Sequence, residues 1–339
     1  MPFLNIHSAG PGLTVQDLGR PGWKAQGLST GGAADRLALF EASAILGGAP
    51  DQAVIEMMGF GGSFSCDAPT RFTLTGAQMQ ADIDGVRLTP YKTQILRPGE
   101  KLTIGGAKSG VYGYLALAGG ITTPPILQSR ATHLTAGIGK RLESGDRLPF
   151  ATDPDLLSPP CKLTPQDRFG GGQIRVMPGP QTGFFATDTL ADFTQTDFTR
   201  SARGNRQGIR LDYDGNGFPI SGGLSIVSDL IVPGDIQMTG DGIPYVLLAE
   251  CQTIGGYPRI GSVIPADLPT IAQAGPGAAL QFTFLSVEEA DVTAQSDHVL
   301  LAQLRSNCVP MIRDPHDIGD LLSYQLISGV TSGDDLERP

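Results

Sequence analysis

Three glycine-rich segments hold the polar side chains that are best placed to do chemistry in this sequence. The first spans residues 14–23, where Gln16, Asp17 and Arg20 surround a turn built from Gly and Pro. An acceptor and a bidentate guanidinium brought together in this way could bind a substrate in one pocket. Asp17 and Arg20 could equally pair with each other and brace their own turn, so both interpretations stand.

The second segment spans residues 203–211 and contains Asn205, Arg206 and Gln207 in succession. Three forked polar side chains in a row suit the recognition of an anion or an amide. An exposed turn would have the same composition. The pattern therefore predicts either a binding loop or a solvated turn.

The third segment spans residues 250–261. Gln252 and Thr253 follow an apolar run, and a Gly-Gly-Tyr-Pro turn lets backbone amides and the phenol of Tyr257 approach a ligand. Packing alone gives no reason for a buried strand to run into an uncharged Gln-Thr and Gly-Gly loop. We therefore favour a ligand-binding role for this loop.

Several familiar chemistries lack support in the sequence. Cys251 lies inside the third segment, but no histidine is near it, so we interpret it as a structural thiol and not as a nucleophile. The stretch 102–110 misses the register of a phosphate loop, because Ala107 separates its glycines from Lys108. The four histidines are scattered and the four cysteines show no paired spacing, so no metal site is predicted.

Composition limits the class of protein. Gly (46) and Pro (26) make up 72 of 339 residues, about 21%. Because each interior Gly costs a helix about 1 kcal/mol and each Pro about 3, we expect a mainly β chain with a few short helices. The net charge of −10, with no block of like charges, argues against nucleic-acid binding. No signal peptide or membrane span is recognisable, so we expect a cytoplasmic protein.

The pattern along the chain predicts two related β units. One helix is expected over 35–46, then strands over 53–58, 71–76, 93–96, 101–105 and 111–119, with a hairpin over 81–89 that turns at Asp84-Gly85. A second helix is expected over 182–190. The strand and Gly-Pro pivot of 4–12 recur at 174–180, on the far side of a Pro- and Gly-rich stretch. The predicted division is a first domain 1–152, a linker 153–172, a second domain 173–286 and a C-terminal extension 287–339.

Several strings point to a known family. They are TVQDLGRPGW at 14–23, LTGAQ at 74–78, YLALAGGI at 114–121, SRAT at 129–132 and QTIGGYPRIGSVIPADLPTIAQAGPG at 252–277. These strings resemble the allophanate hydrolase subunit 2 family, also called the carboxyltransferase C/D domain family, over about residues 3–286. The resemblance implies two cyclophilin-like β-barrel subdomains, in agreement with the duplicated β pattern.

The resemblance also implies partners and an activity. The family includes the C component of 5-oxoprolinase, which works with the A and B components of that enzyme to open the lactam of 5-oxoproline to glutamate with ATP hydrolysis. We therefore expect a non-autonomous hydrolase subunit that acts on a cyclic amide with a B component (subunit 1 type) and an A component as partners. The alternatives are a component of the biotin-dependent urea carboxyltransferase type, and a regulatory module that antagonises a kinase-inhibitor partner.

The resemblance suggests roles for individual residues by motif position. Gln252, Tyr257 and Arg206 are the catalytic candidates, since a neutral fork, a phenol and a guanidinium would stabilise charge that develops on an amide or ureido group. The substrate-binding candidates are Gln16, Asp17, Arg20, Asn205 and Thr253. Members often have Asp shortly before the Q-T string, where this chain has Glu250. ATP is the expected cofactor of the complex at an unassigned site, and neither a tightly bound metal nor biotin is expected.

Overall fold

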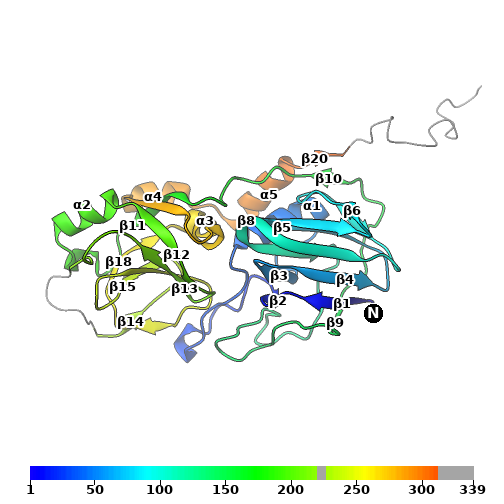
Figure 1. Cartoon of the computed structure of the whole chain (residues 1–339), viewed down its shortest axis with the longest axis horizontal. Coiled ribbons are helices and arrows are strands. Elements are labelled where there is room, and N and C mark those ends of the chain that lie inside the picture. The colour runs from blue at the N-terminus through cyan, green and yellow to red at the C-terminus, as the bar shows by residue number, and fades with distance from the viewer. Residues whose placement is uncertain (220–226, 312–339) are drawn as a thin grey trace, which may run out of the picture.

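The computed structural model describes residues 1–219 and 227–311, which form two lobes that lie side by side (Figure 1). The first lobe contains a nine-stranded sheet and the second a closed seven-stranded barrel. The predicted mainly β architecture with a few short helices is thereby confirmed. The last 28 residues of the predicted C-terminal extension, 312–339, lie outside the described part of the chain.

The first lobe is a half-barrel. Its strands are β1 Phe3–Ala9, β2 Leu13–Gln16, β3 Val54–Met58, β4 Gly62–Cys66, β5 Thr70–Ile83, β6 Val86–Arg87, β7 Gln94–Leu96, β8 Leu102–Leu117 and β9 Arg147–Pro149. The helical turn η1 Lys24–Gln26 and the helix α1 Arg36–Leu46 lie between β2 and β3, as predicted for 35–46. The sheet order is β2-β3-β8-β4-β1-β9, and β5 pairs with β6, β7 and β8.

Two strands are longer than the sequence predicts. The glycines that suggest strand ends near 76 and 105–110 lie inside β5 and β8, where the pairing of the two strands shifts register. Gly76 has φ +71°, and a Cβ there would lie 2.3 Å from the carbonyl oxygen of Tyr112. These glycines therefore form bulges and do not end the strands. The predicted turn at Asp84-Gly85 is confirmed, since both residues have positive φ, as a primed hairpin turn requires.

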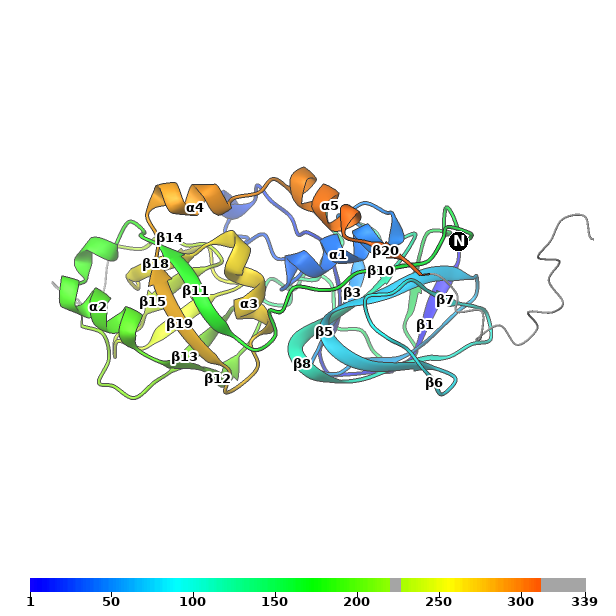
Figure 2. The same ribbon diagram turned by 90° about the horizontal axis from the view of Figure 1, so that it is seen from above.

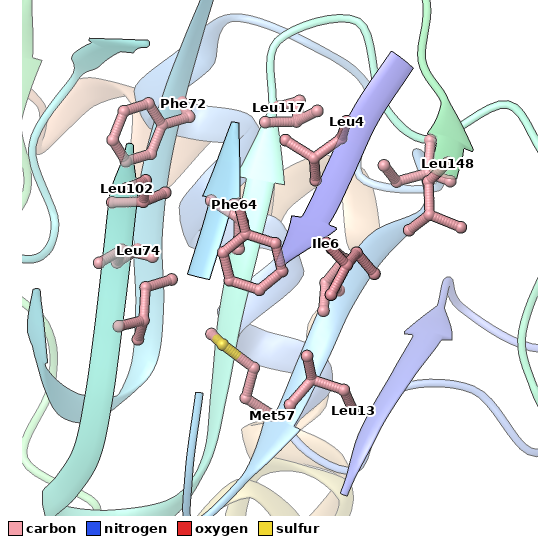
Figure 3. Close-up of a cluster of buried hydrophobic side chains, with 14 of the residues drawn as sticks. Leu4, Ile6, Leu13, Met57, Phe64, Phe72, Leu74, Leu102, Leu117 and Leu148 are labelled. Carbon is pink, nitrogen blue, oxygen red and sulfur yellow. The ribbon is translucent and has the colours of Figure 1, made fainter. Parts of the chain in front are cut away.

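The sheet of the first lobe buries side chains on both faces. One face holds the main core, with Leu4 and Ile6 of β1, Phe64 of β4 and Leu117 of β8 (Figure 3). The side chains that alternate with these on β8 point to the other face, where α1 packs on Tyr114 and its neighbours. The sheet thus packs on the hydrophobic core with one face and on helix α1 with the other.

The second lobe is built from shorter strands. Its barrel has the order β11-β18-β15-β16-β13-β12-β19. These strands are β11 Gly172–Met177, β12 Phe198–Gly204, β13 Gly208–Asp212, β15 Asp235–Met238, β16 Pro244–Leu247, β18 Arg259–Val263 and β19 Ala279–Phe284. A parallel pairing of β11 with β19 closes the barrel. Four Phe side chains fill its interior at centroid separations of 5.1–5.9 Å. They come from the helix Thr187–Gln195, from β12, from the loop after β13 and from β19: Phe193, Phe198, Phe218 and Phe282.

The remaining elements are short. They are β10 Cys161–Lys162, β14 Asp229–Leu230, β17 Ile254–Gly255, β20 Val309–Pro310, η2 Thr182–Phe184, α2 Thr187–Gln195, η3 Pro265–Asp267, α3 Leu268–Gln273, α4 Val287–Thr293 and α5 Asp297–Ser306. The predicted helix over 182–190 is confirmed only in part, because Phe185 adopts an extended conformation that separates η2 from α2. The side chain of Phe185 is buried in the barrel core. Among the described residues, no helix is long and apolar enough to cross a membrane.

One buried side-chain amide, that of Gln273, forms hydrogen bonds across the interface between the two lobes. Gln273, at the end of α3, accepts hydrogen bonds from the backbone N–H groups of Val111 (2.9 Å) and Tyr112 (3.1 Å) through its Oε1. Its Nε2 donates to the Tyr112 carbonyl and to Asp35, which caps α1 (each 2.8 Å). A side chain with no exposed surface thus completes the hydrogen bonding of the sheet in the other lobe.

The chain then returns from the barrel to the first lobe. Figure 2 shows α4 beside the barrel and α5 beside α1. Leu304 of α5 is buried against Phe40 of α1, and Arg36 forms an exposed ion pair with Asp297 (2.6 Å). The last described helix therefore packs on the lobe in which the chain began.

We expect Gln273→Ala to lower the free energy of unfolding by about 3 kcal/mol, because two backbone N–H groups and one carbonyl lose their partner inside the protein. Gln281→Ala is the matched control, since this glutamine is exposed on β19 and should change stability by no more than about 0.5 kcal/mol. Chemical denaturation followed by circular dichroism measures both. Equal stability of the two variants would contradict the role given to Gln273.

Candidate functional site

A pocket of about 350 Å³ lies in the barrel lobe, between two of the three segments that the sequence singles out. The first wall is the hairpin between β12 and β13, where Asn205 accepts a hydrogen bond from the backbone N–H of Gln207 (2.7 Å). The second wall is the loop after β16, with Gln252 and Tyr257. Both loops lie at the same end of the barrel, because β13 and β16 are antiparallel neighbours and the start of β13 pairs with the end of β16.

Glycine allows the second loop to close over the pocket. A Cβ at Gly255 would lie 2.5 Å from Nε2 of Gln237 on β15. A side chain at residue 255 would therefore have to displace the end of the Gln237 side chain, so glycine is favoured here. The Nε2 atom of Gln237 is buried and has no hydrogen-bond partner in the described residues. Gln237 therefore contributes to the pocket wall, while its Nε2 atom is covered by neighbouring groups.

The chemistry of the pocket is that of neutral hydrogen bonding. Its lining includes four carboxamides and two phenols: Asn205, Gln207, Gln237, Gln252, Tyr245 and Tyr257. Arg203 is the one charged residue among the lining residues that the structure describes. Carboxamides offer a donor and an acceptor on one rigid group, which is the pattern needed to pair with an amide, lactam or ureido group.

Arg206 points away from this pocket into the interface between the lobes. Its Nε donates to Glu250 (2.6 Å), and its other nitrogens contact Glu56 of β3 and the carbonyl of Gly32. Burial opposes the charge, but the attraction of Glu56 and Glu250 raises the pKa of Arg206 above its usual value. The guanidinium is thus fully occupied within the protein and is not among the lining residues.

Glu56 is held in turn by the first lobe. Its second oxygen accepts hydrogen bonds from the hydroxyl of Tyr114 (2.9 Å) and the backbone N–H of Ala34 (2.8 Å). Every oxygen of this buried carboxylate therefore has a partner. The hairpin next to the pocket is anchored, through Arg206, to the sheet of the other lobe.

A buried histidine adjoins the same cluster. His133 Nε2 lies 2.8 Å from the hydroxyl of Ser29, while its Nδ1 accepts from the backbone N–H of Ala136 (3.2 Å). Since Nδ1 is an acceptor, the proton is on Nε2 and is donated to Ser29. This serine therefore lacks a base. Glu250 Oε2 lies 3.7 Å from Nδ1 of His133, beyond hydrogen-bond distance, so Ser29, His133 and Glu250 do not form a nucleophilic triad.

The first sequence segment does not line the pocket. Gln16 is fully buried and donates to Thr14 (3.0 Å) and to the carbonyl of Thr132 (3.1 Å). Asp17 accepts from Ser129 and from the backbone of Arg130 (each 2.6 Å) and so braces the loop 129–132.

Arg20 and Thr253 are also buried outside the lining. Arg20 donates to the carbonyl of Ala131, although two of its nitrogens have no partner in the described residues. Burial lowers the pKa of Arg20, and the charges of Asp17 and Glu250 oppose this shift. Thr253 accepts at its carbonyl from the N–H of Ile231 (3.1 Å). Of the predicted residues, the structure thus gathers Asn205, Gln252 and Tyr257 around one pocket.

Neither a reactive thiol nor a metal centre accompanies the pocket. Burial raises the pKa of Cys251 to about 12, so the thiol stays protonated at neutral pH. This agrees with its interpretation as a structural residue. In the described part of the chain, no group of three or more His, Cys, Asp or Glu side chains is arranged to hold a metal ion.

Sequence reasoning does not identify the residues that orient the site. Glu56 lies on β3, Gln237 on β15 and His133 in the loop between β8 and β9, and no local motif connects them with the binding loops. Only the fold brings them together. Glu250 is the first residue of the third segment, but its partner Arg206 is 44 residues away.

The chain is similar in sequence to several other proteins over most of its length. Residues 26–284 match the family described as carboxyltransferase domain, subdomain A and B. The chain is 32% identical over 300 residues to the C component of 5-oxoprolinase from Haemophilus influenzae, and the match covers 86% of this chain and 94% of that one. It is 27% identical over 323 residues to urea amidolyase of Saccharomyces cerevisiae, covering 89% of this chain but 18% of that protein.

A solved structure shows the same fold. The crystal structure of K. lactis urea amidolyase superposes with a TM-score of 0.77 at 21% identity, over 92% of this chain and 21% of that chain. The two-lobed β architecture is therefore also found as one part of a much longer polypeptide.

We expect the stability of the protein to fall as the pH drops from about 7 to 5.5, in part through His133. Burial lowers the pKa of His133 below its ordinary value near 6.5, with Glu250 opposing the shift. The unfolded chain therefore binds a proton that the folded chain does not, and stability is lost as the pH falls through the unfolded pKa. Denaturation at several pH values should show a smaller loss for His133→Gln.

The control for this prediction is His298→Gln, because His298 is exposed on α5. It should keep the pH dependence of the wild-type protein. A His133→Gln variant with the full wild-type loss would show that another group is responsible.

Proposed function

The chain belongs to the carboxyltransferase domain family, subdomain A and B, and from this membership we propose that it is the C component of an ATP-dependent 5-oxoprolinase. The single observation that supports this most is the pocket lined by carboxamides and phenols, which matches a small cyclic amide. In this proposal the chain acts with a B component to activate the lactam, and an A component is needed for hydrolysis to glutamate.

The lactam is complementary to the pocket in hydrogen bonding. Its N–H needs an acceptor, which the Oε1 atom of Gln252 or the Oδ1 atom of Asn205 supplies. Its carbonyl needs a donor, and the half-exposed phenol of Tyr257 is suited to this role. When the lactam oxygen attacks a phosphoryl donor, the nitrogen lone pair shifts towards carbon and its N–H becomes more acidic. An acceptor at that N–H stabilises this change.

Arg206 acts in this proposal as a positioning residue. Its ion pairs with Glu56 and Glu250 fix the hairpin that presents Asn205 and the loop that presents Gln252. The pocket itself has Arg203 as its one cation, which gives it little to offer a triphosphate. ATP is therefore assigned to the complex and not to this pocket.

The extent of the similarity favours this function over the second candidate. The relative named as the C component of 5-oxoprolinase is matched over 94% of its length, whereas the urea amidolyase is matched over 18%. A ureido group would nevertheless satisfy the same carboxamides. A carboxyltransferase-type component that acts on urea is thus the second candidate, and a regulatory module without turnover is the third.

Reconstitution tests the function directly. We expect the purified chain alone to release no glutamate from 5-oxoproline, and the chain mixed with the A and B components to release it only when ATP is present. Turnover of urea with carboxybiotin in place of glutamate release would favour the carboxyltransferase candidate. Binding to the B component without any turnover would favour the regulatory one.

Two substitutions test the pocket. We expect Gln252→Ala and Tyr257→Phe each to lower kcat/KM of the reconstituted enzyme about tenfold, the loss of one hydrogen bond to substrate. Gln281→Ala removes an exposed carboxamide from the same lobe, outside the pocket, and should keep full activity. Gel filtration checks that each variant still binds its partners. Full activity of both pocket variants would remove the support for this site.

A further inference from the structure

A second cavity, of about 490 Å³, lies in the first lobe. Its walls come from β5, from the segment after the Asp84-Gly85 turn, from the middle of β8 and from the stretch that follows β10. Its volume lies within the range of small-molecule sites, about 300–1,000 Å³. None of its lining residues belongs to the pocket described above.

The cavity is cationic in an acidic protein. Among the residues that the structure describes, four of the lining residues are basic, namely Arg87, Lys92, Lys108 and Lys162, and none is acidic. The chain as a whole has 34 acidic and 24 basic residues. Within residues 1–219 and 227–311, none of these four side chains forms an ion pair. Asp82 pairs with Arg87 across the β5–β6 hairpin. Its carboxylate accepts a hydrogen bond from the backbone N–H of Gly85.

Two of the lysines are held directly opposite each other. Lys92 and Lys162 form an antiparallel bridge that is flanked by hydrogen bonds from Thr93 N–H to the Cys161 carbonyl (2.9 Å) and from Leu163 N–H to the Tyr91 carbonyl (3.0 Å). This is the non-hydrogen-bonded type of pair, in which the Cα atoms approach to about 4.5 Å and the side chains are closest. Like charges in this position destabilise a sheet. A bound anion would remove that cost.

The backbone at this pair is held firmly. Tyr91 has φ +59°, a conformation that only a few per cent of residues other than glycine adopt. Its N–H donates to the Leu74 carbonyl (2.8 Å) and its hydroxyl to the Gly76 carbonyl (2.9 Å), so that β5 fixes it from both ends. The strained residue thus sets the position of Lys92 against Lys162.

The rest of the lining suits the organic part of a ligand. Met79, Leu88 and Leu163 give apolar surface, and Gln78, Thr89 and Thr164 give uncharged hydrogen-bonding groups. A flat or aliphatic group could therefore pack beside the four cations. An acidic surface of another protein would match the charge but would not fill a concave cavity with apolar walls.

We propose that this cavity binds a small organic polyphosphate, with Lys92, Lys108, Lys162 and Arg87 around the phosphates. A nucleoside triphosphate has the charge, the size and the flat apolar group that the cavity can hold. The site stands on the charges and geometry of this lobe and not on the reaction proposed above. The chain would bind the polyphosphate alone, whatever substrate its other pocket takes.

Calorimetry and thermal unfolding of the full chain test this inference. ATP should bind more tightly than ADP and AMP and should raise Tm, adenosine should show no binding, and inorganic triphosphate should bind more weakly than ATP. Affinity should fall as the salt concentration rises. Binding that is no stronger than that of sulfate at equal ionic strength would overturn the proposal, as would preferential binding of a polyglutamate peptide.

Paired variants locate the site. The double variant Lys92→Gln and Lys162→Gln should weaken ATP binding at least about tenfold. It should also raise Tm in the absence of ligand, because the repulsion between the two ammonium groups is gone. The control Lys101→Gln and Lys140→Gln removes the same charge from exposed lysines outside the cavity and should bind ATP as the wild type does. Unchanged ATP affinity in the first double variant would overturn the assignment. Because binding is measured on the chain alone, failure here is distinct from failure of the reconstituted reaction.

Discussion

The architecture depends on buried ion pairs whose charges come from both lobes. Arg206 of the barrel hairpin pairs with Glu56 of the sheet and with Glu250. A second arginine, Arg168, lies between the lobes and pairs with Asp35 (2.8 Å) and Glu41 (2.7 Å) at α1. Removal of one partner would leave the other charge buried and uncompensated, so each lobe requires the other. This requirement fixes the orientation of the lobes and, with it, the loops of the pocket.

Fold class is readable from the sequence because it follows from composition and local turns. The Asp84-Gly85 turn is predictable, since both φ angles are set by those two residues. The prediction of a strand end at Gly76 is wrong, because this glycine admits the carbonyl of Tyr112 from a strand far along the chain. A local pattern can show that a glycine is needed. It does not show whether the need is a turn or a close approach.

The candidate site is predictable to the extent that it is local. Asn205, Gln252 and Tyr257 lie on loops with a recognisable composition, and the structure brings them together. Arg206 is a neighbour of Asn205 in sequence but faces the opposite way, since its partners include groups of the other lobe. Gln237 is on a barrel strand without any motif. Burial and direction depend on tertiary contacts, and these decide which polar residues can meet a ligand.

The packing of α5 on α1 affects how the chain can fold as it leaves the ribosome. Phe40 and Ile45 of α1 are part of a cluster that includes Leu304, and the carbonyl of Gly48 accepts from Arg305 (2.9 Å). The surface of the first lobe is therefore completed by residues synthesised more than 250 positions later. Until then an apolar face of α1 is open to chaperones or to misassembly. The first lobe can therefore reach its complete packing only after α5 has been synthesised.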